Sequence, residues 1–313
     1  MTQRCLYCYQ HLSEHDQDFH AKCCKKLFGT TLPPTLSLGM EDLKEMARSL
    51  IIRSVAITGV QPKLSLDLEK IDGRTSRLTV VGLWGDYILK PPTEQFKSLP
   101  ENEDLTMKLA TLCGIRTAEH TLIRLQSGGL AYLTKRFDRQ NDKKIHVEDL
   151  CQLTENLTEH KYRSSIEKVG KAIRNHTTNK GLDVLALFEL VVFCFITGNS
   201  DMHLKNFSLV RFDNGKIELS PAYDLVCTKL ALPEDLEESA LTINGKKNRL
   251  KRGDFDELAT KLAIPTKSFE RVYAKFIKKR AAMLELLEQS FLPEEIKKIY
   301  AELLVEKIKR LSQ

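Results

Sequence analysis

Residues 197–208 read T-G-N-S-D-M-H-L-K-N-F-S and directly follow one of the most apolar stretches of the chain, F-E-L-V-V-F-C-F-I at 188–196. Gly, Asn, Ser and Asp favour surface turns for local backbone reasons, so one interpretation is a simple exposed turn. The other is that a buried helix ends at a loop whose polar side chains have a function. The residues that follow favour the second interpretation.

Two strand-like segments come after this loop. They are F-S-L-V-R-F at 207–212 and D-N-G-K-I-E-L at 213–219, and the N-G pair predicts a hairpin turn between them. The chain then continues through S-P-A-Y-D-L, which contains Asp224. Because two strands joined by a short turn bring their outer ends together, we expect Asp224 to lie close to Asn206.

An aspartate followed five positions later by an asparagine has the spacing of a protein-kinase catalytic loop. In such loops the aspartate accepts the proton of the attacking hydroxyl, the asparagine helps to hold Mg²⁺, and a second aspartate also binds the metal. Asp201, Asn206 and Asp224 fit these roles in that order. Mg²⁺ takes oxygen ligands and retains waters, so a carboxylate and an amide suffice beside the nucleotide phosphates. The D-x4-N spacing is common by chance, and the hairpin with its second aspartate makes the pattern more specific.

A lysine in the first half of the chain is placed to contact nucleotide phosphates. Lys90 ends the strand-like segment Y-I-L-K and follows T-G-V-Q-P-K, a glycine-containing turn that could cover the nucleotide. The alternative for Lys90 is a solvated strand end. The turn lacks the several glycines of a G-x-G-x-x-G loop, and the sequence contains no Walker A pattern.

The first half of the chain contains both strand-like and helical segments. Segments of β-type composition lie at 64–68, 77–82, 86–90, 120–125 and 130–136. Between them, residues 102–114 predict a helix, because Leu105, Leu109 and Leu112 fall on one face and Gly114 is a suitable stop. This pattern predicts a sheet with one helix against it.

The second half, after about Asp138, is mostly helical. Helical periodicity is present at 166–173, 182–196, 268–287 and 294–311. We therefore expect an α+β protein with a small mixed lobe at 1–138 and a larger helical lobe at 139–313.

Composition limits the class of protein without naming a ligand. The 313 residues are 42% hydrophobic and 29% charged, which is normal for a globular protein, and the net charge of +6 is a mild excess that favours anionic ligands. The longest apolar run contains Glu189 and is shorter than the roughly 20 residues a bilayer requires. No basic-plus-apolar signal segment is visible, so we expect a soluble cytoplasmic protein with no membrane partner.

The cysteines fall into two groups. A disulfide framework is not expected at this length, and the four that are scattered through apolar contexts predict reduced core thiols. They are Cys113, Cys151, Cys194 and Cys227. The other four, Cys5, Cys8, Cys23 and Cys24, lie near the start of the chain.

The N-terminal group has the spacing of a metal site. C-L-Y-C and F-H-A-K-C place Cys5, Cys8, His20 and Cys23 in a C-x2-C…H-x2-C pattern, which can bind Zn²⁺ tetrahedrally. The alternative is a set of buried or idle thiols in an amphipathic segment. Zinc bound here would be structural, because four protein ligands leave no open position.

Seven ordered blocks, within about residues 50 to 228, resemble the HipA-type serine/threonine kinases, which are toxins of bacterial toxin–antitoxin modules. The blocks are S-V-A-I-T-G-V-Q-P-K-L-S-L, Y-I-L-K-P, E-N-E-D-L-T-M-K-L-A, Y-L-T-K-R-F-D-R, H-V-E-D-L-C-Q-L, G-N-S-D-M-H-L-K-N-F-S-L and L-S-P-A-Y-D-L. The resemblance implies a bilobed protein-kinase-like fold with ATP between the lobes. Only about fifty residues precede the glycine-containing turn. In this respect the chain is similar to the short HipT form, in which the first segment of the longer kinases is a separate small protein, HipS.

The resemblance also implies roles for individual residues. Asp201 would be the catalytic base, Asn206 and Asp224 would bind Mg²⁺, and Lys90 would contact the phosphates with Glu103 as its partner. The loop over the phosphates would include Gly59, Val60, Gln61 and Lys63. Lys135 and Phe137 would meet the adenine through their backbones, Asp138 would meet the ribose, and His203 and Lys205 would lie in the catalytic loop, where Lys205 could steady the transferring phosphoryl group. The residues alone would favour an exposed loop for Lys135 and Asp138.

Kinases of this family phosphorylate their own glycine-rich loop and thereby inactivate themselves. A phosphate of about −1.5 to −2 charge beside the ATP phosphates would expel the loop. The family's serine lies three residues before the loop glycine, where this chain has Ala56. The resemblance therefore implies autophosphorylation at Ser54 or Thr58, and Ser54 is favoured.

The family's substrates are aminoacyl-tRNA synthetases, and modification of an active-site loop stops translation. The short form favours the tryptophanyl enzyme, with the glutamyl enzyme second. The implied partners are a HipS-like protein and a HipB-like helix-turn-helix antitoxin, with DNA contacted only through the antitoxin. Two rival functions remain, a small-molecule kinase and a catalytically silent adaptor in a DNA complex. The presence of Lys90 together with Asp201, Asn206 and Asp224 argues against the silent adaptor.

Overall fold

The computed structural model describes residues 4–36, 62–81, 84–140 and 143–313. The predicted loop residues Gly59, Val60 and Gln61 and the predicted phosphorylation sites Ser54 and Thr58 lie outside the described residues.

The chain forms two compact units. Unit 1 comprises Met1–Asp104, Ala118–Phe137 and Gln289–Leu292, and unit 2 comprises Leu105–Thr117, Asp138–Glu288 and Pro293–Gln313. The expected halves, 1–138 and 139–313, differ from these units mainly in the segments that follow Asp104 and Glu288.

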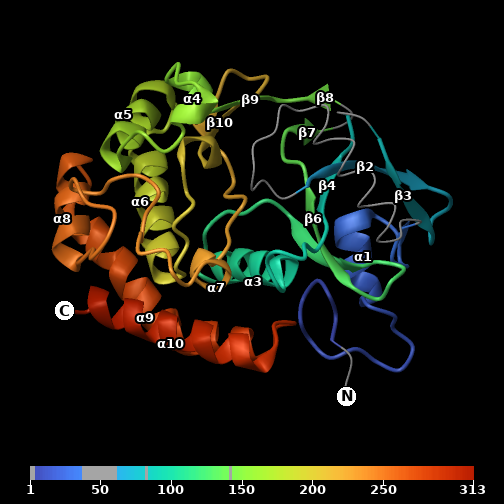
Figure 1. The fold of residues 1–313 in the computed structure, drawn as a ribbon. Helices are drawn as coiled ribbons and strands as arrows, with labels where there is room; N and C mark the ends of the chain where they lie inside the picture. The colour runs from blue at the N-terminus through green and yellow to red at the C-terminus, as the bar shows by residue number, and fades with distance from the viewer. Residues whose placement is uncertain (1–3, 37–61, 82–83, 141–142) are drawn as a thin grey trace. The chain divides into compact units, whose positions relative to one another are not determined.

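Unit 1 is built on a six-stranded sheet with the order β1-β3-β2-β4-β6-β5 (Figure 1). Its strands are β1 (Thr35–Leu36), β2 (Leu64–Lys70), β3 (Ser76–Val80), β4 (Tyr87–Lys90), β5 (His120–Arg124) and β6 (Leu130–Lys135). Neighbouring strands are antiparallel except for the parallel pair β1 and β3. Each of the five predicted strand segments forms one of β2 to β6, which confirms the expected sheet.

Helix α1 (Ala21–Phe28) packs onto this sheet. Leu27 and Phe28 belong to the same buried apolar cluster as Leu66 of β2 and Leu89 of β4. The Tyr87 hydroxyl donates a hydrogen bond of 2.8 Å to the Leu27 carbonyl oxygen. These contacts attach the N-terminal segment to the centre of the sheet.

Helix α3 (Leu99–Leu112) begins in unit 1 and ends in unit 2. Leu105 and Leu109 are fully buried, as the periodicity predicts. Gly114 follows the helix with a φ of 81°, a left-handed conformation that glycine adopts without strain. The helix begins three residues before the predicted start and presents the polar residues 102–104 to the interior of unit 1.

Unit 2 is mostly helical around α6 (Lys180–Ile196), which packs against α5, α9 and α10 (Figure 1). From Leu187 to Ile196 every residue except Glu189 is buried, as expected of a helix that is apolar all round. Glu189 forms an ion pair with Lys275 of α9. The other helices are α4 (Leu150–Leu153), α5 (Ile166–His176), α7 (Thr228–Ala231), α8 (Arg252–Lys261), α9 (Thr266–Glu288) and α10 (Glu294–Leu311).

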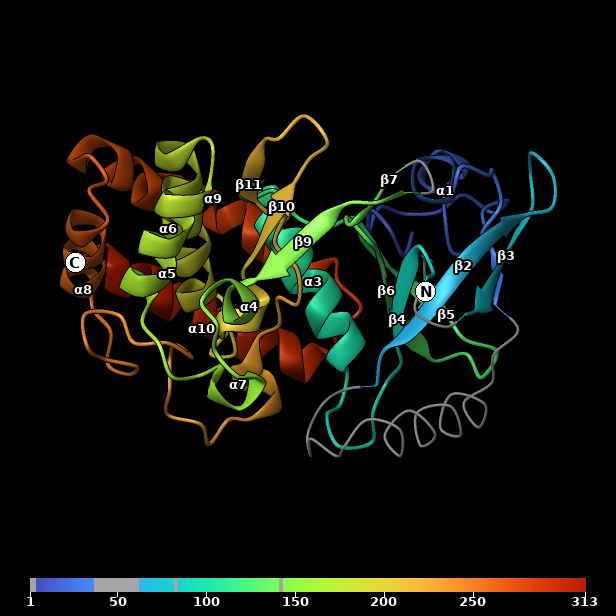
Figure 2. The same cartoon turned by 90° about the horizontal axis from the view of Figure 1, so that it is seen from above.

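A small antiparallel sheet in unit 2 carries the predicted hairpin. It consists of β9 (His146–Asp149), β10 (Ser208–Arg211) and β11 (Ile217–Leu219) in the order β11-β10-β9 (Figure 2). Gly215 has a φ of 80° in the turn between β10 and β11, which confirms the hairpin. The sequence did not predict β9, nor the short pair β7 (Arg139–Gln140) and β8 (Lys143–Lys144).

Two further predictions concern residue environments. The scattered cysteines Cys113, Cys151, Cys194 and Cys227 are buried with free thiols, as expected. Among the residues that the structure describes, every helix is too short or too polar to cross a bilayer.

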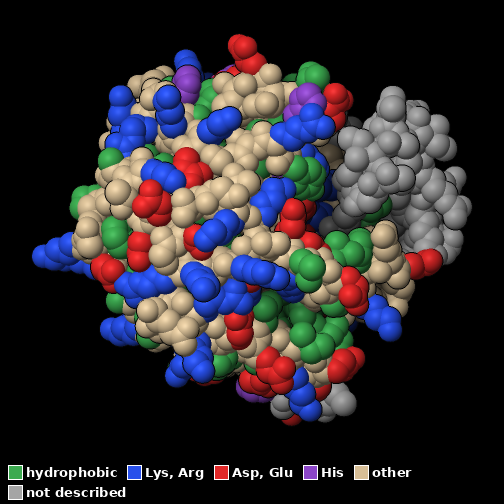
Figure 3. All heavy atoms as spheres, turned by 60° about the vertical axis from the view of Figure 1, so that its left-hand side comes forward, with side chains coloured by type: hydrophobic (Ala, Val, Ile, Leu, Met, Phe, Trp, Pro, Cys, Tyr) green, Lys and Arg blue, Asp and Glu red, His purple; other side chains and the backbone are tan. Residues whose placement is uncertain are grey.

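The mild basic excess is distributed rather than concentrated on the face shown in Figure 3. Lysine and arginine side chains are spread over this face, and aspartate and glutamate side chains lie among them. A dedicated nucleic-acid-binding surface typically presents an uninterrupted basic stripe. On the described part of this face the acidic groups interrupt the basic ones.

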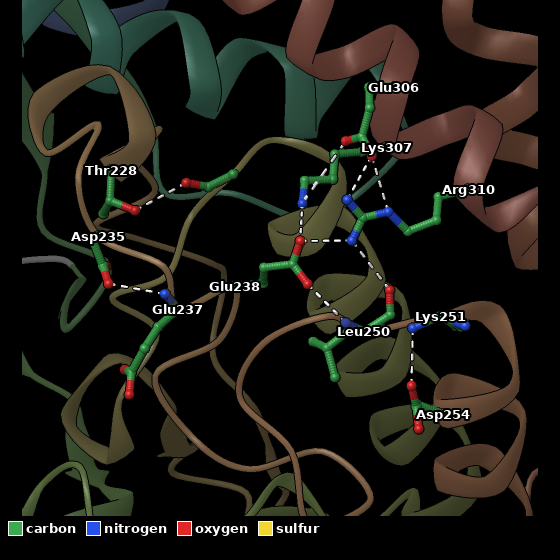
Figure 4. A network of polar contacts seen from close by, with 11 residues as sticks. Thr228, Asp235, Glu237, Glu238, Leu250, Lys251, Asp254, Glu306, Lys307 and Arg310 are labelled. Atoms are coloured by element: carbon green, nitrogen blue, oxygen red, sulfur yellow. Dashed lines mark hydrogen bonds and ion pairs between the residues drawn. The ribbon is translucent and has the colours of Figure 1, made fainter.

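A buried ionic cluster joins the segment after α7 to α10 within unit 2 (Figure 4). Glu238 accepts hydrogen bonds from Lys307, from Arg310 at 2.6 Å and from the Leu250 N–H at 2.8 Å. Burial raises the pKa of the Glu238 carboxyl, but these hydrogen bonds outweigh it, so the pKa lies below its ordinary value of 4.5. The side chain of Lys307 is only 5% exposed, and Glu238 is its nearest carboxylate.

We expect Glu238→Gln to lower the free energy of unfolding by about 3–5 kcal/mol near neutral pH, because it removes the nearest carboxylate from the buried Lys307 ammonium and leaves only Glu306, at 3.9 Å, as a counter-charge. The lowered pKa means that this contribution is present above pH 4.5 and is lost as the pH falls through the folded-state pKa. Urea unfolding followed by circular dichroism measures both effects. Glu234→Gln, at an exposed position on the same segment, should change stability by less than about 0.5 kcal/mol. Equal stability of the two variants would contradict this account of the cluster.

Candidate active site

The loop after α6 carries Asp201 and is fixed by short-range contacts. Gly198 has a φ of 65°, a left-handed conformation that glycine adopts without strain, and a Cβ at this position would lie 2.6 Å from the Leu303 side chain, which would have to move. The Asp201 N–H donates to the Asn199 side-chain oxygen at 3.0 Å. The Thr228 hydroxyl donates to the Gly198 carbonyl oxygen at 2.9 Å. These contacts fix the backbone that leads into Asp201.

Asn206 ends a 3₁₀ helix, Leu204–Asn206, and is buried. Its Nδ2 donates to the Asp201 carbonyl oxygen at 2.9 Å. Its backbone N–H donates to the His203 carbonyl oxygen, also at 2.9 Å. This arrangement turns the amide so that its oxygen, the atom that could bind a metal ion, points away from the Asp201 carbonyl.

The side chain of Asp201 is held by a residue that the sequence did not single out. The Tyr162 hydroxyl donates to Asp201 Oδ1 at 2.6 Å, and the Tyr162 ring packs edge-to-face against the His203 ring at 5.0 Å. Burial lowers the pKa of His203, although the nearby carboxylates of Asp201 and Asp224 partly offset the effect. His203 is therefore neutral near neutral pH.

Asp224 follows β11 in a strained backbone conformation. Its φ is 55°, which is uncommon for a residue other than glycine and often marks a functional position. The adjacent Tyr223 hydroxyl donates to the Lys205 carbonyl oxygen at 2.8 Å and lies 2.6 Å from the Ser208 hydroxyl. These bonds tie the segment of Asp224 to the loop that carries Asn206, at the outer end of the β10–β11 hairpin.

Lys205 is held by Asp149, a second residue that the sequence did not single out. Lys205 Nζ lies 2.7 Å from Asp149 Oδ2. Asp149 pairs with Ser208 in the sheet and caps α4, where it forms a reciprocal capping box with Gln152. The D-L-C-Q spacing is the sequence signal of such a box and could have predicted this helix start. The salt bridge fixes the position of the Lys205 ammonium in the loop that carries Asp201 and Asn206.

In unit 1, Lys90 and Glu103 form a buried ion pair. Lys90 Nζ lies 2.5 Å from Glu103 Oε1, and the two side chains are 5% and 4% exposed. Lys90 is the last residue of β4, Glu103 lies in the first turns of α3, and the Tyr132 ring lies 5.3 Å from the Lys90 ammonium. A strand lysine paired with a helix glutamate is the arrangement that protein kinases use to hold nucleotide phosphates.

The remaining implied nucleotide contacts within the described residues are Lys63, Lys135, Phe137 and Asp138. Lys63 is exposed directly before β2. The Lys135 N–H donates to the Glu119 carbonyl oxygen at 2.7 Å, so a backbone contact of Lys135 with a nucleotide would have to use its carbonyl. Phe137 is the last residue of its unit 1 segment, and Asp138, in unit 2, forms an ion pair with Arg139 at 2.7 Å.

A kinase-like protein is the class that this fold and these two clusters define. The model of the HipA-like C-terminal domain family matches residues 55–284, and the chain belongs to that family. This result confirms the predicted HipA-type membership, while the HipT form stays a prediction.

Several curated proteins are similar in sequence. The chain is 32% identical over 226 residues to the putative kinase Y4dM of Sinorhizobium fredii, covering 68% of this chain and 54% of that protein. It is 26% identical over 271 residues to a putative kinase of Haemophilus influenzae, covering 77% of each. It is 28% identical over 207 residues to the serine/threonine-protein kinase toxin HipA of Shewanella oneidensis, covering 59% of this chain and 45% of the toxin. The chain thus spans about half the length of two of these three relatives.

Two solved structures share the fold. One is HipA of Shewanella oneidensis in a complex with HipB and operator DNA, with a TM-score of 0.66, 22% identity, and coverage of 82% of this chain and 64% of that one. The other is the Helicobacter pylori proinflammatory kinase CtkA, with a TM-score of 0.53, 16% identity, and coverage of 80% and 94%. The predicted α+β, kinase-like fold is therefore confirmed.

Proposed function

We propose that the chain is an ATP- and Mg²⁺-dependent serine/threonine protein kinase. The observation that carries the proposal is the arrangement around the β10–β11 hairpin, where Asp201, Asn206 and Asp224 are held by one hydrogen-bonded framework. One amide oxygen and one carboxylate, from Asn206 and Asp224, are a donor set that suits Mg²⁺. When bound, Mg²⁺ would neutralise charge on the phosphate oxygens of ATP.

The chain's own groups would then carry out the transfer. The Asp201 carboxylate accepts the proton of a serine or threonine hydroxyl while that oxygen forms a bond to the γ-phosphorus. The bond from the γ-phosphorus to the bridging oxygen breaks, and ADP leaves. Lys90, oriented by Glu103, contacts the phosphates, and Lys205 balances charge on the transferring group. Neutral His203 packs against the ring of Tyr162, which donates to Asp201, and so acts as a positioning residue.

The substrate we propose is an aminoacyl-tRNA synthetase, with the tryptophanyl enzyme favoured and the glutamyl enzyme second. The similarity to a serine/threonine-protein kinase toxin supports a protein substrate, and the family resemblance implies the synthetase. The complex of the Shewanella oneidensis protein with HipB and operator DNA supports a HipB-like antitoxin as a partner, with DNA contacted through it. We also propose that a HipS-like protein is a second partner and that the chain acts in the cytoplasm.

Purified chain incubated with γ-labelled ATP and either purified synthetase tests the substrate. We expect label on the tryptophanyl enzyme and a matching loss of its aminoacylation activity. Label on the glutamyl enzyme alone would show that the glutamyl enzyme, and not the tryptophanyl enzyme, is the substrate. Absence of label on both, with label on another protein of a cell extract, would contradict the synthetase proposal and leave the kinase proposal standing.

Autophosphorylation at Ser54 gives a separate prediction. Ser54→Ala should abolish most phosphate incorporation into the chain and raise the remaining kinase activity several-fold, because the phosphate that repels ATP is no longer added. Intact-mass measurement and a synthetase labelling assay report the two effects. Thr58→Ala is the matched control and should incorporate phosphate as the wild type does. The reverse pattern would assign the modification to Thr58.

A further inference from the structure

A cluster of thiols and one imidazole in unit 1 plays no part in the proposed kinase chemistry. Cys5, Cys8, His20 and Cys23 each offer one ligand atom, and these atoms all lie within 4.8 Å of one another. A tetrahedral zinc site with Zn–S bonds of about 2.3 Å has ligand atoms roughly 3.6–3.8 Å apart. The His20 Nδ1 lies 3.4 Å from the Cys8 sulfur and 3.8 Å from the Cys23 sulfur. The four side chains therefore surround a space of the size that a single tetrahedral ion fills.

The orientation of His20 is the second observation. While its Nδ1 faces the thiols, its Nε2 lies 2.9 Å from the His11 carbonyl oxygen. A carbonyl can only accept, so Nε2 carries the proton and donates it, which leaves the lone pair of Nδ1 directed at the cysteines. Metal-bound histidines are typically fixed in this way, with the second ring nitrogen donating to a carbonyl or carboxylate.

The backbone is also folded around the cluster. The Cys5 N–H donates to the Gln10 carbonyl oxygen, and the Tyr9 N–H donates to the Cys5 carbonyl oxygen, both at 2.9 Å. This tight turn brings Cys5 and Cys8 to one side, with Tyr9 in the left-handed region at a φ of 63°. His20 is the N-cap of α1, and Cys23 lies three residues later, in the first turn of the helix. Two sequence-distant pairs of ligands are thus presented by two preorganised turns.

The N-terminal segment has little regular secondary structure of its own. Before α1 the described residues contain only isolated bridges. The segment contacts the rest of the protein through apolar side chains such as Leu6 and Phe19, through the ion pair of Asp18 with Arg124 of β5, and through the hydrogen bond from Tyr9 to Asp104. A metal crosslink between its two turns is the usual way in which so short a segment is stabilised.

We propose that Cys5, Cys8, His20 and Cys23 form a structural zinc centre, in which His20 binds through Nδ1. Four protein ligands complete a tetrahedral shell, so no position is open for a substrate and the site is not catalytic. Its role is to hold the two turns together beneath α1 and thereby to attach the N-terminal segment to the sheet. The proposal is independent of the kinase chemistry, because none of its ligands belongs to the proposed active site.

Zinc analysis of the full chain, purified with a thiol reductant and without chelator, tests the proposal. We expect about one zinc per wild-type chain, and a zinc content at least about fivefold lower in Cys8→Ser and in His20→Ala. Two matched controls should keep about one zinc. Cys24→Ala removes a buried thiol next to Cys23 that is not part of the cluster, and His11→Ala removes an imidazole but retains the carbonyl that orients His20.

Cobalt reports on the ligands without relying on variants that could fail to fold. Wild-type chain stripped of metal and titrated with Co²⁺ should develop the intense visible bands of a tetrahedral ion together with thiolate-to-cobalt charge-transfer absorption. Any of three results would overturn the proposal. They are wild-type chain that binds no Zn²⁺ after reconstitution, a Cys5–Cys8 disulfide in the reduced preparation, and a full complement of zinc in His20→Ala.

Discussion

Asp201→Asn is expected to slow phosphoryl transfer by about 10²- to 10⁴-fold, because an amide cannot accept the proton of the attacking hydroxyl. The substitution keeps the size of the side chain and an oxygen that can accept the hydrogen bond from Tyr162. The backbone contacts of this residue with Asn199 and Asn206 do not involve its carboxylate. We therefore expect the fold and the KM for ATP to change little, while kcat falls.

Single-turnover transfer from γ-labelled ATP to a protein substrate measures this effect. Asp213→Asn is a matched control, since Asp213 is an exposed aspartate near the turn of the hairpin that follows the catalytic loop. It should retain the wild-type rate. If Asp201→Asn and Asp213→Asn transfer phosphate equally fast, Asp201 is not the catalytic base.

Lys90→Met is expected to reduce kcat/KM by about 10²- to 10³-fold, because it removes a positive charge that stabilises the phosphates during transfer. It should also lower the free energy of unfolding by about 3–5 kcal/mol, since the carboxylate of Glu103 is buried against that ammonium. Steady-state kinetics and urea unfolding measure the two effects separately. Lys97→Met, at an exposed lysine between β4 and α3, should change neither quantity appreciably.

A double variant separates the role of Lys90 in catalysis from its role in stability. Lys90→Met combined with Glu103→Leu removes both charges of the buried pair, and such replacements are often neutral for stability. We expect the double variant to recover most of the lost stability but none of the lost activity. Recovery of activity along with stability would mean that Lys90 acts only through the fold.

The sequence predicted the elements whose periodicity is strong and local. β2 to β6 coincide with the five segments of β-type composition, and the second half of α6, from Leu187 to Ile196, is buried nearly all round, as its apolar sequence requires. The hairpin after the catalytic loop follows from its N-G turn. In each case the signal lies within a few consecutive residues.

The contacts that hold the candidate site depend on residues far apart in the sequence. Tyr162 donates to Asp201 across 39 positions, and Asp149 pairs with Lys205 across 56. The strand β9, which brings Asp149 beside β10, has only four residues and no clear alternation of buried and exposed positions. Because such pairings are set by tertiary packing, local propensity and motif spacing do not reveal them.

We propose that Asn206 and Asp224 together hold the metal ion of a nucleotide. The most direct measurement is a crystal structure of the wild-type chain grown with Mg²⁺ and a non-hydrolysable ATP analogue. The account predicts one Mg²⁺ with the Asn206 amide oxygen and an Asp224 carboxylate oxygen each at about 2.0–2.1 Å, and nucleotide phosphate oxygens among its other ligands. A nucleotide-bound Mg²⁺ that contacts neither side chain would contradict it.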